Sequence, residues 1–331
     1  MHGWIVIDKP VGPGSTQIVS AVKRALRDGG YPKLKVGHGG TLDPLASGVL
    51  PVALGEATKL AGRMLGADKV YEFTIRFGAE TDTLDAEGEV TARSEVRPSR
   101  GELEAVLPRF TGEIQQVPPA FSALKVEGKR AYTLARAGET VELQSRRVTV
   151  HELKVKEEDP HPTLSRRRER ASVAREPQGL LLPLAGEGGD EGLLPSSLSS
   201  ITLAARVSKG TYIRSLARDI AHALETVGHV AMLRRTKAGP FGLGSAISLD
   251  KLGELARART LEQALLPLAA GLDDIPALTV TPDQARLLRQ GRQVIGIAAK
   301  PGLHLATDRS VPVALVELSE ACLRVVRGFN L

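Results

Sequence analysis

Gly37-His-Gly-Gly-Thr-Leu-Asp-Pro-Leu-Ala-Ser-Gly48 is the most distinctive stretch of this 331-residue chain. Its four glycines allow positive φ angles and a close approach of the backbone to a ligand. They surround His38 and Asp43, two side chains of the kinds that act as acids, bases or nucleophiles. Taken alone, the stretch also fits a tight loop in which Asp43 caps a helical turn that begins at Pro44.

Apolar segments with the length of buried strands lie on both sides of this loop. Residues 4–7 precede it, and residues 49–54 follow it directly. Residues 69–78 then alternate between apolar and polar side chains, which predicts a half-buried strand. Its inner face carries Tyr71, Phe73, Ile75 and Phe77. A tyrosine in such a position is ordinarily a core residue with a hydrogen-bonded hydroxyl group, so the pattern alone assigns Tyr71 no chemistry.

Helical and extended segments follow one another irregularly in the rest of the chain before residue 226. Apolar spacing predicts a first helix from an N-cap at Ser15 to about residue 26. Further helices are predicted over residues 99–110, 129–137 and about 212–225, and strands over 147–156 and 201–207. There is no regular strand–helix–strand rhythm. We therefore predict an α+β fold with a mixed, mostly antiparallel sheet flanked by helices.

Two segments differ in composition from this core. Residues 157–200 are rich in Pro, Ser, Gly, Leu and Arg and have no sustained period, so we interpret them as a disordered, low-complexity insertion. Such an insertion is ordinarily a tolerated surface loop, and an RNA-contacting arm is the alternative. Residues 276–331 combine a short helix with several β-like runs and predict a small β-rich domain. The expected division is one domain over 1–272, including the insertion, and a second over 276–331.

Composition excludes several classes of protein. A net charge of +6 and a pI near 9.5 favour a polyanionic partner. No apolar run reaches the roughly 20 residues that span a bilayer, and the N-terminus lacks the layout of a secretory signal. The single cysteine, Cys322, excludes an internal disulfide, and the seven histidines lack the spacing of zinc ligands. We therefore expect a cytoplasmic protein without a membrane segment or a bound metal.

A second polar cluster, Lys209-Gly-Thr-Tyr-Ile-Arg214, directly precedes a predicted amphipathic helix. It carries the phenol of Tyr212 and the guanidinium of Arg214 two residues apart. Arg214 could pair with a carboxylate, or it could occupy the exposed surface of the first helical turn. The local pattern does not distinguish these alternatives.

Six blocks of sequence resemble one family in the expected order. GHGGTLDPLASGVLPVALGEATKL, residues 37–60, closely resembles the catalytic motif of the bacterial tRNA pseudouridine-55 synthase family, the TruB family. The other five blocks are IDKPVGPGST, KVYEFTIRFGAETDTLDAEG, QVPPAFSALKVEGKRAYTLAR, SKGTYIRSLARDIAHAL and HVAMLRRTKAGPF. The resemblance covers essentially the whole chain except residues 157–200. It implies a pseudouridine synthase fold followed by a PUA-like RNA-binding domain.

The resemblance implies roles for five residues. Asp43 matches the essential aspartate of the family, and Arg214 matches the arginine that pairs with it. Tyr212 matches an active-site tyrosine. Tyr71 matches the tyrosine that stacks on the target base and has been proposed to accept the proton from C5. His38 matches the histidine that contacts RNA and helps to hold the target nucleotide out of its stack.

The implied reaction isomerises uridine 55 in the T loop of tRNA to pseudouridine. The base is flipped out, its N1–C1′ bond is broken and a C5–C1′ bond is formed. Atoms are conserved, so no ATP, metal or redox cofactor is needed. The carboxylate can add to C6, capture C1′ or remove a sugar proton, and the sequence leaves all three routes open. The implied partner is the T-arm stem-loop of tRNA, bound by a monomer.

Two departures from the family pattern, at Gly39 and in the insertion over residues 157–200, and two rival functions remain. Gly39 stands where many family members have a threonine after the histidine. A non-catalytic tRNA-binding protein or tRNA folding chaperone could use the same fold. A nucleoside or glycoside hydrolase would need a second carboxylate, for which the candidates are Asp82, Asp85 and Asp219.

Overall fold

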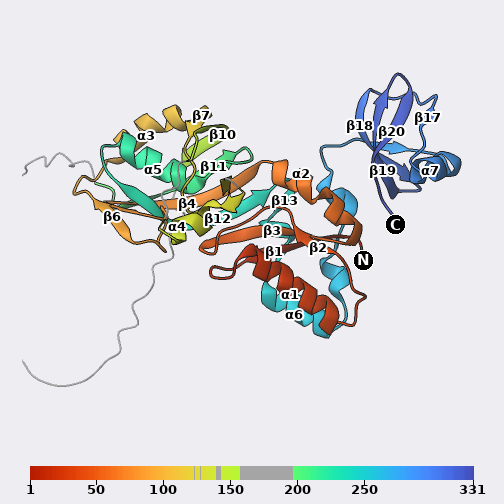
Figure 1. Cartoon of the computed structure of the whole chain (residues 1–331), viewed down its shortest axis with the longest axis horizontal. Helices are drawn as coiled ribbons and strands as arrows, with labels where there is room; N and C mark the ends of the chain where they lie inside the picture. Colours follow the sequence, from red (N-terminus) through yellow and green to blue (C-terminus); the bar gives the residue numbers. More distant parts are fainter. Residues whose placement is uncertain (123, 127, 139–142, 157–196) are drawn as a thin grey trace, which may run out of the picture.

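The computed structural model describes residues 1–122, 124–126, 128–138, 143–156 and 197–331 (Figure 1). The predicted insertion lies outside these residues except for 197–200, and Ser200 is already the first residue of a strand. No helix in the described ranges is long and apolar enough to cross a membrane.

The described residues form one large sheet of 11 strands, whose main path runs β14-β1-β3-β12-β4-β11-β10-β7. The strands on this path are Ala246–Ile247 (β14), Gly3–Lys9 (β1), Ala46–Leu54 (β3), Gly228–Ala238 (β12), Lys69–Phe77 (β4), Ser200–Val207 (β11), Arg146–Val155 (β10) and Gly112–Gln116 (β7). The pairs β1–β14 and β3–β12 are parallel, and the other neighbours on the path are antiparallel. The predicted α+β fold with a mixed, mostly antiparallel sheet is therefore confirmed.

Different helices cover the two halves of this sheet. The helix α1 (Ser15–Asp28) lies beside α6 (Leu249–Arg257), and both pack against β1 and β3 in one hydrophobic core (Figure 1). The helices α5 (Ile213–Ala223) and α3 (Arg100–Val106) pack against β4 and β11 in a second core. Tyr71 and Leu233 pack against both cores, so β4 and β12 form the junction between the two halves.

The strand predicted over 69–78 is confirmed as β4, with Phe73, Ile75 and Phe77 buried on its inner face. Two predicted helices are shorter than expected. Residues 129–130 form the short strand β9 before α4 (Ala131–Arg136), and α3 ends at Val106, where a 3-10 helix continues to Phe110.

Ser15 fixes the glycine-rich loop instead of capping a helix. The N-cap of α1 is Gly14, and Ser15 is the first helical residue. The Ser15 hydroxyl donates to the carbonyl of Leu42 at 3.0 Å and accepts from the N–H of Leu42 at 2.8 Å. The alternative that Asp43 caps a helical turn is wrong, because residues 44–45 form a simple turn and β3 follows directly.

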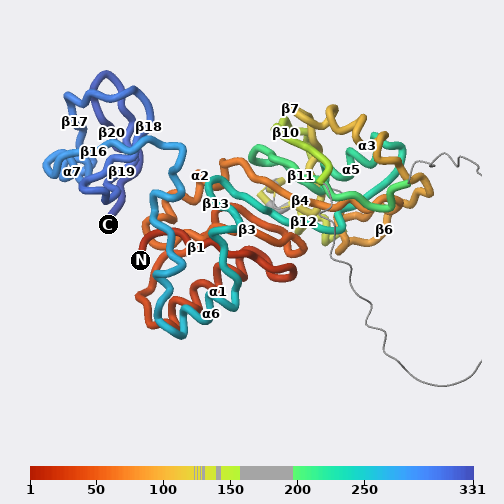
Figure 2. The backbone as a smooth tube through the Cα atoms, turned by 180° about the vertical axis from the view of Figure 1, so that it is seen from behind, coloured from red at the N-terminus to blue at the C-terminus, as the bar shows by residue number. Residues whose placement is uncertain are grey.

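A second sheet forms the predicted β-rich C-terminal part of the chain (Figure 2). Its five strands run in the order β16-β18-β19-β20-β17, and α7 (Pro282–Arg289) packs against them. The strands are Ala277–Thr279 (β16), Val294–Ile295 (β17), Gly302–Asp308 (β18), Val311–Ser319 (β19) and Cys322–Gly328 (β20). The antiparallel hairpins β18–β19 and β19–β20 account for most of its pairing.

The C-terminus ties this second sheet to the large one. Phe329 is 2% exposed and packs in a hydrophobic cluster that includes Trp4 and Leu60. Glu56 accepts a hydrogen bond from the backbone N–H of Asn330 at 2.8 Å and forms an ion pair with Lys59 at 2.6 Å. Burial of the Phe329 ring, together with hydrogen bonds between the Glu56–Lys59 pair and the backbone on either side of it, therefore anchors the end of the chain.

The strand β1 ends in a fully buried lysine. The Lys9 ammonium donates to the carbonyls of Pro10, Pro13 and Pro44 at 2.9, 2.8 and 3.1 Å. The pKa of Lys9 is lowered to about 8, mainly because of burial; the charge of Asp43 partly offsets this effect and the charge of Arg235 adds to it. The lysine thus joins the loop after β1 to the turn after Asp43.

We expect Phe329→Ala to lower the free energy of unfolding by about 3–5 kcal/mol, because it leaves a cavity in a shared core. Urea denaturation followed by circular dichroism measures this change. The matched control is Val326→Ala, since Val326 is 57% exposed and lies in the preceding strand. Equal denaturation midpoints for the two variants would contradict the anchoring role of Phe329.

The lowered pKa of Lys9 predicts a pH-dependent stability. Between pH 8 and 10.5 the unfolded chain binds the Lys9 proton more tightly than the folded chain, so the free energy of unfolding rises with pH. From about pH 8 to 10, this rise should be smaller in Lys9→Met than in the wild type by on the order of 2 kcal/mol. Lys251→Met, which changes an exposed lysine, should behave like the wild type. Identical pH dependence in Lys9→Met and the wild type would refute the shift.

Candidate active site

A cavity of about 310 Å³ opens where the two halves of the large sheet meet. The glycine-rich loop, β4, β12 and the start of α5 all contribute to its lining. The lining residues that matter for chemistry are Asp43, Lys69, Tyr71, Tyr212, Arg214 and Arg235. Four of the five residues singled out from the sequence therefore lie around one cavity, although they are far apart along the chain.

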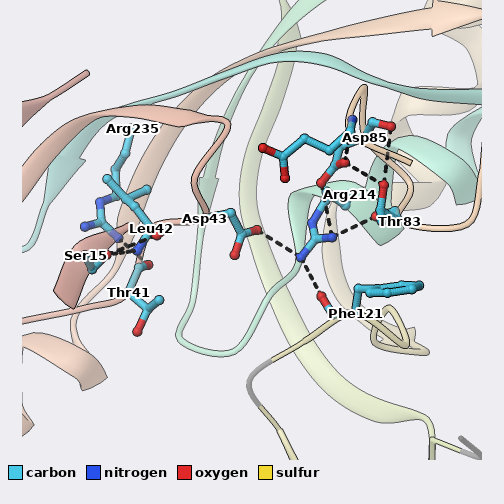
Figure 3. Close-up of polar contacts among 10 residues, drawn as sticks. Ser15, Thr41, Leu42, Asp43, Thr83, Asp85, Phe121, Arg214 and Arg235 are labelled. Atoms are coloured by element: carbon cyan, nitrogen blue, oxygen red, sulfur yellow. Dashed lines mark hydrogen bonds and ion pairs between the residues drawn. The ribbon is translucent and has the colours of Figure 1, made fainter. Parts of the chain in front are cut away.

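Arg214 and Asp43 form an ion pair (Figure 3). One guanidinium nitrogen, Nη2, lies 2.9 Å from Oδ2 of Asp43. The arginine side chain is only 6% exposed, whereas the aspartate side chain is 40% exposed. The cation is thus fixed inside the protein, while its partner carboxylate faces the cavity.

Further contacts surround the Arg214 guanidinium (Figure 3). Nη1 lies 3.2 Å from Oδ2 of Asp85 and donates to the carbonyl of Thr83 at 2.7 Å, and Nη2 donates to the carbonyl of Phe121 at 2.9 Å. A planar guanidinium is suited to several fixed acceptors, and it stays charged when buried. The expectation that Arg214 could lie on an exposed helical turn is therefore wrong, and its pairing with a carboxylate is observed.

The three alternative carboxylates do not line this cavity. Asp85 is buried behind Arg214, and its Oδ1 accepts hydrogen bonds from the Thr83 hydroxyl at 2.6 Å and the backbone N–H of Glu87 at 3.1 Å. Asp82 accepts from the N–H of Glu89, and Asp219 pairs with Arg218. Among the described residues, Asp43 is the one carboxylate around this cavity, and Asp85 lines the adjacent hollow together with Glu87. The oxygens of Asp85 are already held by Arg214, Thr83 and the N–H of Glu87, which argues against its use as the second carboxylate of a glycoside hydrolase.

The two tyrosines are held in different ways. Tyr71 lies on β4 between Ala205 of β11 and Arg235 of β12, so strand pairing on both sides sets its position. Tyr212 precedes α5, and its backbone N–H and carbonyl are both bonded to the side chain of Gln116, at 2.8 and 3.1 Å. Gln116 is 1% exposed and was not recognised from the sequence. Its buried amide fixes the start of the helix that carries Arg214.

His38 lies outside this cavity. It is the last residue of β2 (Val36–His38) and lines an adjacent hollow that also reaches Asp43 and Arg214. Burial lowers the pKa of His38, and the positive charge of Arg235 adds to the effect, so the imidazole is neutral at pH 7. Asp43 therefore lies between two hollows, with Tyr71 in one and His38 in the other.

The departure at Gly39 has a steric explanation. A Cβ atom at this position would lie 2.6 Å from Cβ of Met64, on the helix α2 (Ala61–Gly66). A threonine therefore does not fit here unless α2 moves. In this chain, glycine at 39 and methionine at 64 fill the space between the loop and α2.

Arg235 was not recognised from the sequence, and it holds the loop that carries Asp43. Its Nε donates to the carbonyl of Val49 at 2.8 Å, and its two terminal nitrogens donate to Thr41 at 3.3 Å and Gly40 at 3.1 Å. The strand that bears it can approach β3 because Gly48 has φ +102° and no Cβ, which would lie 2.1 Å from the Arg235 carbonyl oxygen. The one available signal was a pair of arginines directly after the apolar residues Met232 and Leu233.

Comparison with known proteins shows what this chain resembles. Residues 27–170 match the model for "TruB family pseudouridylate synthase (N terminal domain)", and residues 214–273 match "tRNA pseudouridylate synthase B C-terminal domain". The proteins named tRNA pseudouridine synthase B from Zymomonas mobilis and Novosphingobium aromaticivorans are 56% and 57% identical to it. Each match covers 100% of this chain, and the two matches cover 96% and 98% of the lengths of the respective relatives.

A solved structure supports the fold. A chain of a Cbf5-Nop10-Gar1 complex superimposes with a TM-score of 0.66 at 25% identity, covering 99% of this chain and 85% of that one. This likeness concerns architecture, whereas the full-length relatives share more than half of their residues with this chain. On that identity, the chain belongs to the TruB family of pseudouridylate synthases.

Proposed function

We propose that this protein converts uridine 55 in the T loop of tRNA to pseudouridine, with Asp43 as the essential catalytic carboxylate. Relatives named tRNA pseudouridine synthase B match it over its full length. The observation that carries the proposal is the Asp43–Arg214 ion pair of 2.9 Å, in which the buried partner is the arginine and the accessible one is the aspartate.

The ion pair suits the first chemical task, which is to keep a carboxylate ionised beside the substrate. A fixed guanidinium favours the charged form of a neighbouring carboxylate, and Arg214 is itself held by Asp85 and two carbonyls. In Figure 3 one Asp43 oxygen points toward Arg214 and the other points away. The second oxygen is then available to add to C6, to capture C1′ or to take a sugar proton, and all three routes fit this geometry.

The aromatic and imidazole groups suit the second task, which is to hold a base outside its stack. Extruding a nucleotide costs roughly a few kcal/mol, which stacking in the new site can offset. We assign Tyr71 to stacking on the uracil and to loss of the C5 proton, and Tyr212 to binding of the substrate in the same cavity. We assign His38 to the RNA contact that keeps the nucleotide flipped, a role suited to a neutral ring.

The remaining assignments concern organisation and partner. We propose a catalytic domain over residues 1–272 and a PUA-like RNA-binding domain over 276–331, acting as a monomer in the cytoplasm. The second domain carries seven basic and four acidic residues, which favours contact with phosphates. The T-arm stem-loop of tRNA is the proposed substrate, and no cofactor is assigned, because the isomerisation conserves atoms.

Asp43→Asn should abolish turnover and leave RNA binding intact, because the amide keeps the shape of the side chain and loses its charge. We expect the rate to fall by at least about a thousandfold. Tritium release from a T-arm stem-loop labelled at C5 measures turnover, and fluorescence anisotropy measures binding. Asp28→Asn, at an exposed aspartate, is the control. Turnover in Asp43→Asn at a level near that of the control would remove Asp43 from its role.

Arg214→Lys should lower the rate of pseudouridine formation by roughly 100-fold. A single ammonium group cannot make all four contacts of the planar Arg214 guanidinium, which are to Asp43, Asp85 and the carbonyls of Thr83 and Phe121. The control is Arg218→Lys, one helical turn later in α5, where the arginine pairs with Asp219 and is 20% exposed. Single-turnover rates on the same stem-loop separate this loss from weaker binding. Similar small losses in both variants would show that Arg214 is not specifically required.

A further inference from the structure

Two buried cations line the cavity beside Tyr71. Lys69 is 7% exposed and Arg235 is 1% exposed. Across the parts of the chain that the structure describes, neither forms an ion pair with a carboxylate within 4.0 Å. We refer to Lys69 and Arg235 as the cationic pair.

Backbone carbonyls are the partners of the cationic pair. The Lys69 ammonium donates to the carbonyls of Met64, Leu65 and Ala67 at 3.0, 2.8 and 2.6 Å. Arg235 likewise donates to three carbonyls of the strand β3 and the loop before it. Carbonyl dipoles satisfy the N–H groups but leave the positive charge uncompensated, and burying a net charge is costly.

The two charges also repel each other. The pKa of Lys69 falls to about 8, mainly because of burial and then because of the charge of Arg235, while Asp68 partly offsets the change. At pH 7 most Lys69 side chains still carry a proton. Two positive charges thus persist beside a cavity whose one carboxylate among the described residues, Asp43, is paired with Arg214.

The position of the cationic pair relates it to the base. Lys69 precedes Tyr71 by two residues on β4 and so shares its face of the strand, and Arg235 is the β12 partner of Tyr71. All three line the same cavity. A uracil ring stacked on Tyr71 would therefore lie near both cations.

Each route open to Asp43 makes that ring negative. When the N1–C1′ bond breaks, its electron pair goes to N1 and is delocalised over O2 and O4. When the carboxylate adds to C6, the C5=C6 electron pair moves onto C5 and O4. A positive field fixed in a poorly solvated cavity stabilises such charge without reorganisation of the groups that produce it.

We propose that the cationic pair lowers the barrier of the reaction by stabilising the negative charge that develops on the uracil ring. This inference rests on the proposed function. The two side chains act through space, since all three N–H groups of Lys69 are already bonded to carbonyls. The competing explanation is that both residues only brace the backbone around the cavity.

Lys9 is the matched comparison for these explanations. It is also fully buried and also donates to three carbonyls, but it does not line the cavity that contains Tyr71. The experiment compares Lys69→Met, Arg235→Met and Lys9→Met under single-turnover conditions. Each is given a T-arm stem-loop with uridine or with 5-fluorouridine at the target position. Loss of the N-linked nucleoside after nuclease digestion, measured by mass spectrometry, reports cleavage of the N1–C1′ bond.

We expect Lys69→Met and Arg235→Met to cleave the uridine substrate about 10- to 100-fold more slowly than the wild type. With 5-fluorouridine the deficit should shrink severalfold, because fluorine withdraws electrons and the base anion needs less stabilisation. Any deficit of Lys9→Met should be the same for both bases. Lys69→Arg keeps the charge and should therefore recover most of the rate that Lys69→Met loses. If a methionine variant fails to fold, Lys69→Arg still provides a test of the inference.

Equal deficits for the two bases in the cationic-pair variants would overturn the inference, as would a Lys69→Arg protein that folds and remains as slow as Lys69→Met. Failure of the wild type to form pseudouridine from the uridine substrate would instead refute the proposed function. The two failures are therefore distinguishable.

Discussion

The buried guanidinium of Arg214 is the constraint on which the site depends. It contacts Asp43 from the glycine-rich loop, Asp85 and Thr83 from the turn after β5 (Ala79–Thr81), and Phe121 from the segment after β7. A charge with so little exposure is stable only while these acceptors stay in place, because removing one leaves it undercompensated. The same requirement that keeps the arginine satisfied therefore brings distant segments together around one cavity.

The glycine-rich loop is fixed independently from three directions. Ser15 holds the backbone of Leu42, Lys9 holds the carbonyl of Pro44, and Arg235 holds those of Gly40 and Thr41. Each contact ends on the backbone, so it sets the path of the loop whatever side chains the loop carries. The position of the Asp43 carboxylate is thus determined by groups that never touch it, and Arg214 then orients it. A loop without regular structure can in this way hold a reactive group as firmly as a strand does.

Sequence pattern predicted the parts of this fold whose local preference and tertiary environment agree. β4 alternates cleanly because one face packs on a core, and α1 carries its apolar residues at helical spacing. β12 was missed, although it lies at the centre of the sheet, because its arginines interrupt the apolar pattern. Arg234 pairs with Asp8 and Arg235 with backbone carbonyls, and such partners from distant segments cannot be read from local periodicity. The resemblance to a family suggested the pairing of Asp43 with Arg214, which neither local pattern required.

The place of the cavity follows from the way the sheet is built. β12 runs parallel to β3 and antiparallel to β4, so it joins the half covered by α1 and α6 to the half covered by α5. Two hydrophobic cores meet at this junction, and Leu233 and Tyr71 are packed from both sides. Close-packed interiors resist small displacements, so a ring held between two cores is a rigid surface for a base. Charged side chains such as Asp43, Arg214 and Arg235 also lie at this junction. Backbone carbonyls of the neighbouring loops and the opposite charges of the ion pair are their partners. The junction therefore combines a rigid apolar wall with concentrated charge, which is the combination that chemistry on a flipped uracil requires.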